Sequence, residues 1–456
     1  DEDGIEVEEI EDETWRVRKD CAKVLYALVQ HNPDLLSSFL ERLPKPLLAR
    51  FCDRVETVQL EAMGVCDALA RHAKDALEVS LSPSSSAIFA QVQTAYHGVV
   101  QVADRILTSG HSNPVKSRSE GVVHKVLETL LRFMEVKSMT KGGEILSVNH
   151  LVVILKHCLA IVTGKSEFSS SVLIHSDGLA LMCEGIKSHP PSLYGEMAGE
   201  LIDGLSKSVD QKNKAIMVVS LKGLNIFFSR AASKEESIES VNAFKMRVAD
   251  RAEGVAALAQ DCLKSGDSDQ EIRETSISLL GCLISIFGEN LKSRLGLILR
   301  RVDNEPTRLA CLNALGEIAR SEHRDLLIPC VGTLIPKLVE FFRNRSRLLQ
   351  HSSLSLLHTI CSPTSFSSFE LPNIEDVVVG LRGLISLSDL SLCTLSFSTL
   401  SGCLQHIPSS RAVITNTIYK YTLELHSQPL LQGSALVALC DFYVHLAQCG
   451  QNGGVL

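Results

Sequence analysis

The chain has 456 residues, of which 45% are hydrophobic, 5% aromatic and 21% charged, and its formal net charge is −8. One compact core rarely serves more than about 300 residues, so this length predicts either several domains or a repeat protein with an extended core. The acidic balance argues against a chain-wide basic surface for nucleic acid. No apolar run reaches the roughly 18 residues that a membrane-spanning helix needs.

The chain begins with an acidic run, since nine of its first thirteen residues are Asp or Glu. We expect residues 1–13 to form an acidic disordered arm, and the alternative is a docking site for a basic partner. The chain opens with neither a methionine nor a signal peptide, which predicts an internal or processed piece of a longer protein. A first apolar-periodic helix follows at 15–30, and Asn32-Pro33 ends it.

Pairs of predicted helices fill the rest of the chain, and no segment has the alternation of a strand. Pro44 and Pro46 should bend the first helix of the first pair. Loops are expected at 80–86, 137–143 and 361–372. The predicted pairs are 36–51 with 56–73, 87–108 with 114–136, 146–163 with 172–187, 193–208 with 212–231, 242–264 with 269–287, 290–302 with 305–320, 325–342 with 346–360, 374–387 with 390–405, and 411–426 with 430–447.

A short pattern recurs in these pairs: an apolar or β-branched residue, a basic or polar residue, and two small or apolar residues three and four places on. In the later part of the chain its second residue falls at positions 273, 308, 350, 393 and 432, so that the gaps are 35, 42, 43 and 39 residues. Repeats of this period are typical of HEAT or armadillo units, which each consist of two or three helices. The sequence therefore predicts an all-α solenoid, a superhelix of about ten helical hairpins.

Each hairpin of such a stack exposes two apolar faces, which it can bury only against its neighbours. The small residues of the pattern should let one hairpin approach the next closely. The basic residues of the pattern, Arg18, Arg273 and Arg308, should bridge to an acidic turn residue of the preceding hairpin, and the alternative for them is contact with a partner.

No arrangement of residues for catalysis, cofactor binding or metal binding stands out. The sequence contains no GxxxxGK[ST] phosphate loop, GxSxG elbow, HExxH pair or CxxC pair. The fourteen cysteines lie mostly in apolar helical stretches, where a free thiol acts as a small hydrophobic side chain in a reducing compartment. The scattered histidines should be surface or satisfied helix residues: His31, His72, His97, His157, His175 and His189.

Two groups of arginines, each beside a turn between predicted helices, are the candidate contacts with a protein partner. Together they would form one basic ridge toward an acidic partner surface. The alternative is a solvated turn, in which a cation near a helix C-terminus is favoured by up to about 1 kcal/mol. The groups are Arg343, Arg345 and Arg347, and Arg300 and Arg301 with Arg308.

Several stretches resemble the middle of the cullin-associated, neddylation-dissociated (Cand) family. They are DQEIRETSISLLGCLISIFGENL at 269–291, LRRVDNEPTRLACLNALGEIA at 299–319 and SQPLLQGSALVALCDF at 427–442, together with ETWRVRKDCAKVLYALV at 13–29 and LLARFCDRVETVQLEAM at 47–63. The resemblance is strong at 11–70 and 265–447 and poor between about 75 and 260.

The resemblance implies a central fragment of an all-helical HEAT solenoid that wraps around unneddylated cullin–RING scaffolds. Members of the family mask the neddylation lysine of the cullin and compete with adaptor and substrate-receptor modules, so that they act as exchange factors and not as enzymes. No functional residue is carried over by name. The expected division is HEAT repeats at 14–136, divergent HEAT repeats at 137–264, HEAT repeats at 265–447 and a tail at 448–456.

We therefore expect a non-catalytic, monomeric scaffold of the cytoplasm and nucleus, with no cofactor, that works by steric exclusion. Its partner would be a cullin with its RING subunit, and it would bind no nucleic acid, membrane or small-molecule substrate. One alternative is another HEAT-repeat binding protein, such as a nuclear transport receptor or a phosphatase scaffold. The other is a spacer segment that has no cullin contact of its own.

Overall fold

The computed structural model describes residues 3–79, 84–108, 119–136, 148–209, 213–231, 238–265, 269–362, 371–426 and 428–451. Helices account for most of these residues, and no strand occurs among them. The predicted loops at 80–86, 137–143 and 361–372 and the tail at 448–456 lie partly or wholly outside the described residues. The chain divides into two units, residues 1–248 and residues 249–456, and α12 (Ile238–Lys264) crosses the boundary.

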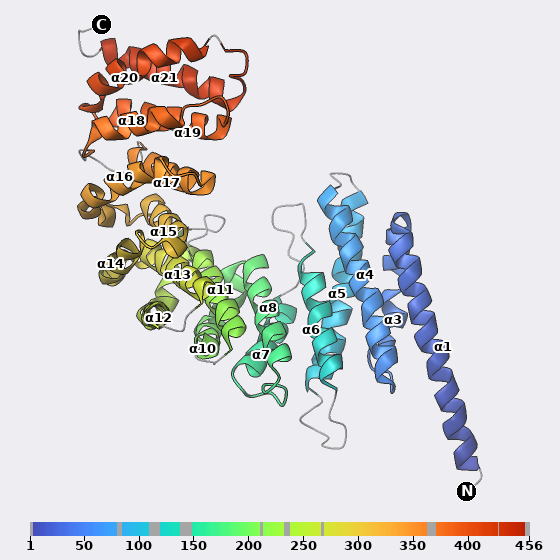
Figure 1. Cartoon of the computed structure of the whole chain (residues 1–456). Helices are drawn as coiled ribbons and strands as arrows, with labels where there is room; N and C mark the ends of the chain where they lie inside the picture. Colours follow the sequence, from blue (N-terminus) through green and yellow to red (C-terminus); the bar gives the residue numbers. More distant parts are fainter. Residues whose placement is uncertain are drawn as a thin grey trace. The chain divides into compact units, whose positions relative to one another are not determined.

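The first unit is a stack of helical hairpins (Figure 1). Short 3₁₀ turns at Pro33–Leu35 and Gly195–Met197 lead into two of its helices. The helices before α12 are α1 (Asp3–His31), α2 (Leu36–Arg42), α3 (Pro44–Arg50), α4 (Glu56–Val79), α5 (Ser84–Thr108), α6 (Glu120–Met134), α7 (Val148–Val162), α8 (Val172–Ser188), α9 (Pro191–Tyr194), α10 (Ala198–Val209) and α11 (Lys214–Ala231).

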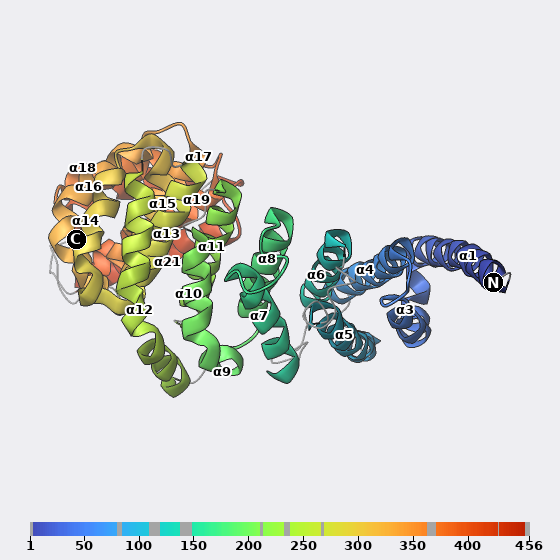
Figure 2. The ribbon, with the colours of Figure 1, turned by 90° about the horizontal axis from the view of Figure 1, so that it is seen from below.

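Two rows of helices make up this stack. Helices α1, α4, α6, α8 and α11 pack on one another in that order, and α3, α5, α7 and α10 form the second row. In Figure 2 the helices α4, α6 and α8 lie above α3, α5 and α7. The packing follows from the apolar spacing, because residues three and four apart share one face of a helix: in α6, Val123, Val126, Leu127 and Leu130 are all at most 1% exposed.

The second unit repeats the arrangement. Helices α13, α15, α17, α19 and α21 pack on one another in order, and α16, α18 and α20 do the same in the second row (Figure 1). Its helices after α12 are α13 (Gln270–Phe287), α14 (Lys292–Arg301), α15 (Arg308–Arg320), α16 (Ile328–Phe342), α17 (Arg347–Cys361), α18 (Ile374–Leu384), α19 (Leu390–His406), α20 (Ser410–His426) and α21 (Ser434–Gln451). Within each unit the predicted all-α stacking of hairpins is therefore confirmed.

Close approach between the helices of the second unit depends on small residues. A Cβ atom at Gly281 of α13 would lie 2.5 Å from the Cβ atom of Ala314 in α15. Gly288 has φ +52°, a conformation that L side chains rarely adopt, and the ring of His323 occupies the space that its Cβ would need. His323 also bonds through Nε2 to the carbonyl oxygen of Ile286 at 3.2 Å. These glycines are not the small residues of the repeated pattern, Ala22, Ala62, Ser276 and Cys311, for which close approach stays a prediction.

Two local expectations differ from the structure. The helix α1 begins at Asp3, where the sequence predicted a disordered arm. The single bent helix expected at 36–51 is two helices, because Pro44 lacks a backbone N–H and starts α3 as its first residue. The finer division at 136 and 264 was drawn from sequence regularity and stays a prediction.

Among the described residues, no helix combines the length and the apolar character that crossing a membrane requires. The apolar side chains are instead buried where helices of the two rows meet.

Candidate protein interface

The six candidate arginines belong to the second unit, at the turns that join α14 to α15 and α16 to α17. These turns are adjacent in space. The guanidinium carbon of Arg308 lies 4.7 Å from the ring centroid of Phe341 in α16, and Asp303 pairs with Lys337 of α16 at 2.6 Å. We call the surface formed by residues 300–308 and 337–347 the turn edge.

Two of the six arginines hold backbone groups together. Arg301 is half-buried and donates a hydrogen bond from Nη2 to the carbonyl oxygen of Leu263, in the last turn of α12, at 2.6 Å. Arg308 donates from Nε to the carbonyl of Val302 at 3.1 Å and from Nη2 to that of Asp303 at 3.2 Å. Carbonyls at the end of a helix lack partners within the helix, so these arginines complete the ends of α12 and α14.

Arg347 forms a two-pronged ion pair with Asp389 across to the next hairpin. Its Nε contacts Oδ2, and its Nη2 contacts Oδ1 at 3.1 Å. Asp389 also accepts hydrogen bonds from the backbone N–H groups of Ser391 and Leu392 and so caps α19. The hydrogen bond from Arg347 is the largest effect that lowers the pKa of Asp389. Arg347 is therefore a tie between hairpins.

The other three arginines of the turn edge are exposed. Arg343 directly follows α16, Arg345 lies in the turn, and Arg300 stands in the last turn of α14. Among the described residues, none of the three has an ion-pair or side-chain hydrogen-bond partner. Their contact with a partner protein stays a prediction, but only these three of the six keep their guanidinium groups free to make one.

A shallow hollow opens on the turn edge between α14 and α16. The ion pair between Asp303 and Lys337 crosses it, and Arg300 stands at its rim. Ligand pockets for small molecules are usually enclosed and mostly apolar, whereas this hollow is open and its lining mixes polar with apolar side chains. Its lining consists of Leu299, Arg300, Val302, Asp303, Thr333, Leu334 and Lys337.

Two residues that organise the turn edge were missed from the sequence, Lys337 and Asp389. Asp389 stands just before the first residue of a helix, which is the usual place of an N-cap, so local pattern could have identified its role at α19. Its pairing with Arg347, 42 residues earlier, has no local signal. The same holds for Lys337, whose partner Asp303 lies 34 residues away.

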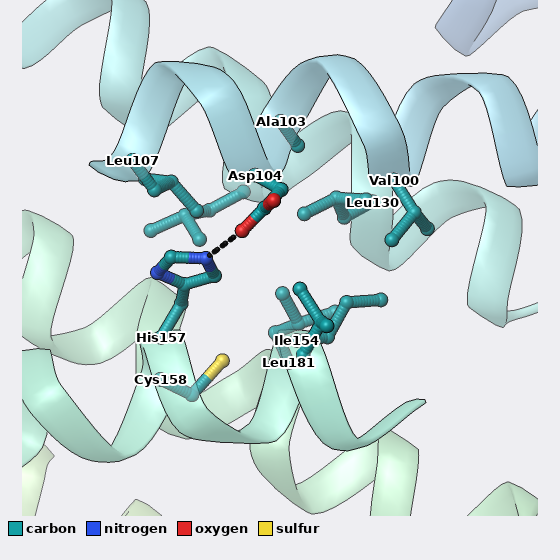
Figure 3. A pocket seen from close by; sticks show the side chains of 11 residues that line it. Val100, Ala103, Asp104, Leu107, Leu130, Ile154, His157, Cys158 and Leu181 are labelled. Atoms are coloured by element: carbon teal, nitrogen blue, oxygen red, sulfur yellow. Dashed lines mark hydrogen bonds and ion pairs between the residues drawn. The ribbon is translucent and has the colours of Figure 1, made fainter. Parts of the chain in front are cut away.

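In the first unit, a small gap lies between α5, α6, α7 and α8, and Figure 3 shows its lining. Most of the lining is apolar, and one polar contact crosses it, from Nε2 of His157 to Oδ1 of Asp104 at 2.8 Å. Burial raises the pKa of the Cys158 thiol to about 12, so at neutral pH this group is a thiol and a poor nucleophile. The gap is a packing contact between hairpins.

Several histidines of the first unit have partners on neighbouring helices. His175 bonds to the hydroxyl of Ser208 at 3.1 Å, and the rings of His97 and His150 stack with centroids 4.5 Å apart. Desolvation is the main cause that lowers the pKa of His175 and of His97. Across the described residues, no group of three or more His, Cys, Asp or Glu side chains is arranged to hold a metal ion.

The sequence was then compared with those of known proteins. No protein-family model matches the chain. Cullin-associated NEDD8-dissociated protein 1 of Drosophila melanogaster is 26% identical over 99% of the chain. Cullin-associated NEDD8-dissociated protein 2 of Rattus norvegicus is 25% identical over 95% of the chain. Cullin-associated NEDD8-dissociated protein 1 of Arabidopsis thaliana is 24% identical over 95% of the chain.

The chain is thus similar, over nearly its whole length, to cullin-associated NEDD8-dissociated proteins. It spans about a third of the length of these curated relatives, namely 35%, 33% and 34% of the three. The resemblance that the sequence showed to this family is thereby confirmed.

Solved structures support the fold alone. Importin beta matches 96% of the chain with a TM-score of 0.62 and 9% identity, and the chain covers 53% of it. An engineered protein matches 94% of the chain with a TM-score of 0.55 and 14% identity, and 95% of that protein is covered. These matches confirm a HEAT-type stack of helices.

Proposed function

We propose that this chain is a non-catalytic HEAT-repeat scaffold that binds unneddylated cullin–RING ubiquitin ligase cores. In this proposal it promotes exchange of substrate-receptor modules and masks the neddylation site of the cullin. It would act as a monomer in the cytoplasm and the nucleus, without nucleic acid, membrane or small-molecule substrate.

The observation that carries the proposal is the match to cullin-associated NEDD8-dissociated proteins over nearly the whole chain. The structure is consistent with a scaffold, since each unit offers a long surface of stacked hairpins. Several buried thiols are also unsuited to catalysis, because desolvation raises the pKa of Cys158, Cys183 and Cys311 to about 12.

Steric exclusion requires a large interface, because a scaffold spreads its affinity over many contacts. Exchange further requires that the chain and a substrate-receptor module weaken each other's binding while both are bound, which is a coupling free energy between two sites. Neither requirement involves a reacting group.

Co-purification tests the proposal. The purified chain is mixed with a cullin–RING pair in its unneddylated form and, separately, in its neddylated form. We expect retention of the unneddylated pair and weak or no retention of the neddylated pair. Equal retention of both forms would show that the neddylation site is not masked. Displacement of a bound substrate-receptor module, followed by fluorescence, then measures exchange.

The likeness to importin beta supports a second candidate, a nuclear transport receptor. Its test is a pull-down with a Ran-type GTPase loaded with GTP and with transport cargo. Nucleotide-dependent binding of the GTPase, with no cullin retained, would favour this candidate. The low identity of 9% restricts the likeness to the fold.

A spacer segment is the remaining alternative, because the relatives are about three times as long as this chain. A longer chain that contains 1–456 and retains the cullin, while 1–456 alone does not, would favour the spacer.

A further inference from the structure

Basic side chains gather at the turn edge, although the chain as a whole is acidic. The chain as a whole carries a formal net charge of −8. At the turn edge, with the paired Asp389 included, the basic residues outnumber the acidic ones. The basic residues are Arg300, Arg301, Arg308, Lys337, Arg343, Arg345 and Arg347, and the acidic ones are Asp303, Glu305, Glu340 and Asp389.

Some of these charged side chains have partners within the chain, and others have none among the described residues. Arg301 and Arg308 donate hydrogen bonds to backbone carbonyls, and Arg347 forms an ion pair with Asp389. Lys337 forms an ion pair with Asp303. Among the described residues, the exposed charges of the turn edge that have no ion-pair or side-chain hydrogen-bond partner are those of the three arginines Arg300, Arg343 and Arg345 and of the two carboxylates Glu305 and Glu340, so positive charge is in excess.

The backbone is fixed at two of the three free arginines, Arg343 and Arg300. Arg343 follows the last residue of α16, and its backbone N–H bonds to the carbonyl of Glu340 at 3.1 Å, which fixes the start of its side chain. Arg300 extends from α14, whose C-terminus is held by Arg308. These two cations are therefore displayed by the ends of helices, so that ordering them in a complex costs little backbone entropy.

We propose that the turn edge binds an acidic segment of a partner protein, with Arg300, Arg343 and Arg345 as its anchoring cations and the hollow between α14 and α16 as the seat of one acidic side chain. Planar guanidinium groups suit carboxylates because they can donate two parallel hydrogen bonds to one carboxylate. The inference rests on the proposed function only for the identity of the partner, and its chemistry stands on the turn edge itself.

A peptide of alternating Glu and Ser residues, labelled with fluorescein, probes the site by fluorescence anisotropy. The wild-type chain is compared with the turn-edge variant, which carries R300E, R343E and R345E. We expect the Kd for the peptide to rise about tenfold or more in the variant at low ionic strength, since each exposed pair contributes modestly. Binding by the wild-type chain should weaken at about 0.15 M salt, because salt screens exposed charges.

A charge-matched variant controls for the loss of positive charge. It carries K292E, R320E and K420E, three exposed residues of the same unit away from the turn edge. Its Kd for the peptide should stay within about twofold of the wild-type value. A peptide of alternating Gln and Ser should not bind the wild-type chain. Thermal unfolding of the turn-edge variant should resemble that of the wild type, because none of its substitutions removes a contact within the fold. The charge-matched variant loses the exposed pair between Lys292 and Glu289, which contributes less than about 1 kcal/mol.

Equal weakening by the turn-edge variant and the charge-matched variant would overturn the inference, and so would an unchanged Kd in the turn-edge variant. The same variants are then mixed with the unneddylated cullin–RING pair. A wild-type chain that binds the acidic peptide at the turn edge but retains no cullin would contradict the proposed function and leave the turn edge intact. A chain that retains cullin but does not bind the acidic peptide would contradict the inference about the turn edge and leave the proposed function intact.

Discussion

Ion pairs link neighbouring elements in both units, but those of the first unit include buried carboxylates, whereas the carboxylates of the pairs in the second unit are reached by solvent. Lys125 of α6 pairs with the buried Asp67 of α4, and on its other side α6 reaches α8 through His124 and Asp177 at 2.5 Å. Lys74 and Glu135 add a further pair between α4 and α6. The contacts between these helices therefore depend on ionisation.

In the second unit, several side chains that link neighbouring helices donate to backbone carbonyls. Arg301 bonds to the carbonyl of Leu263, and the hydroxyl of Tyr421 donates to that of Ile385 at 3.0 Å. Gln350 donates to the carbonyl of Phe342 at 3.0 Å. A carbonyl does not titrate and leaves no buried charge when its donor is removed. The difference predicts that the first unit is more sensitive to changes in charge, and the second to changes in volume.

The largest effect should follow from Lys125→Met in the first unit. The change leaves Asp67, whose side chain is 4% exposed, without its counter-charge, and breaking such a pair costs about 3 kcal/mol. Hydrogen exchange should show lower protection of the amides of α4 and α6. In the matched control, Lys187→Met removes a cation that is 51% exposed and should cost less than about 1 kcal/mol.

Asp67→Asn together with Lys125→Met should recover much of the lost stability, since no charge is then buried. Normal exchange protection in the Lys125→Met chain would show that Asp67 is accommodated without its partner.

In the second unit, Gly281→Ala should cost about 2 kcal/mol. The added Cβ would lie 2.5 Å from the Cβ of Ala314 and 2.8 Å from its Cα, so that α13 and α15 must move apart. Gly296 of α14 is the control, because nothing lies within 4 Å of its Cβ position. Gly296→Ala should stabilise the helix by up to about 1 kcal/mol. Urea unfolding measures both, and similar midpoints for the two variants would contradict the close approach.

Asp389→Ala should destabilise the second unit by about 1 kcal/mol, because α19 loses its cap and Arg347 loses its partner. Asp389→Asn keeps an oxygen that can cap the helix and removes only the charge. It should therefore cost a few tenths of a kcal/mol, since exposed ion pairs contribute little. If both variants shift the unfolding midpoint equally, the ion pair outweighs the cap.

The smallest effect should be a dependence on pH at α8 and α10. Burial lowers the pKa of His175, so the folded state favours the neutral ring. Its contribution to stability is complete above the ordinary pKa of about 6.5 and is lost as the pH falls through the lower pKa of the folded state. Exchange protection of α8 and α10 should decrease on acidification from about pH 7 to pH 5, and less so in His175→Gln. An identical decrease in both chains would assign the effect to other groups.

Helix positions could be predicted because the signal is local. The predicted helix 390–405 corresponds to α19, Leu390–His406, and the predicted 325–342 corresponds to a 3₁₀ turn followed by α16, Ile328–Phe342. Apolar residues at helical spacing mark such segments without reference to the rest of the chain. The break at Leu43 also had a local cause in Pro44, but the choice between bend and break depends on packing.

The candidate interface could be predicted only in part. The sequence identified the turns that carry the six arginines, but it treated the arginines alike. The sequence also predicted that basic residues of the repeated pattern bridge to the preceding hairpin. Arg18 departs from this prediction, because it pairs with Asp53 in the turn of the following hairpin. Arg308 bonds to carbonyls of the turn next to its own helix. Partners of long side chains depend on which turns are neighbours in space.

The sequence by itself determined that the chain forms paired helices with a repeat of about forty residues, because apolar spacing along a helix is a property of adjacent residues. It also determined the likeness to a family of cullin-associated proteins. Only the tertiary structure decided which arginines are structural and which are free, since Arg347 and Arg345 are two residues apart and differ only in whether Asp389 lies within reach. That reach is fixed by the packing of α17 on α19.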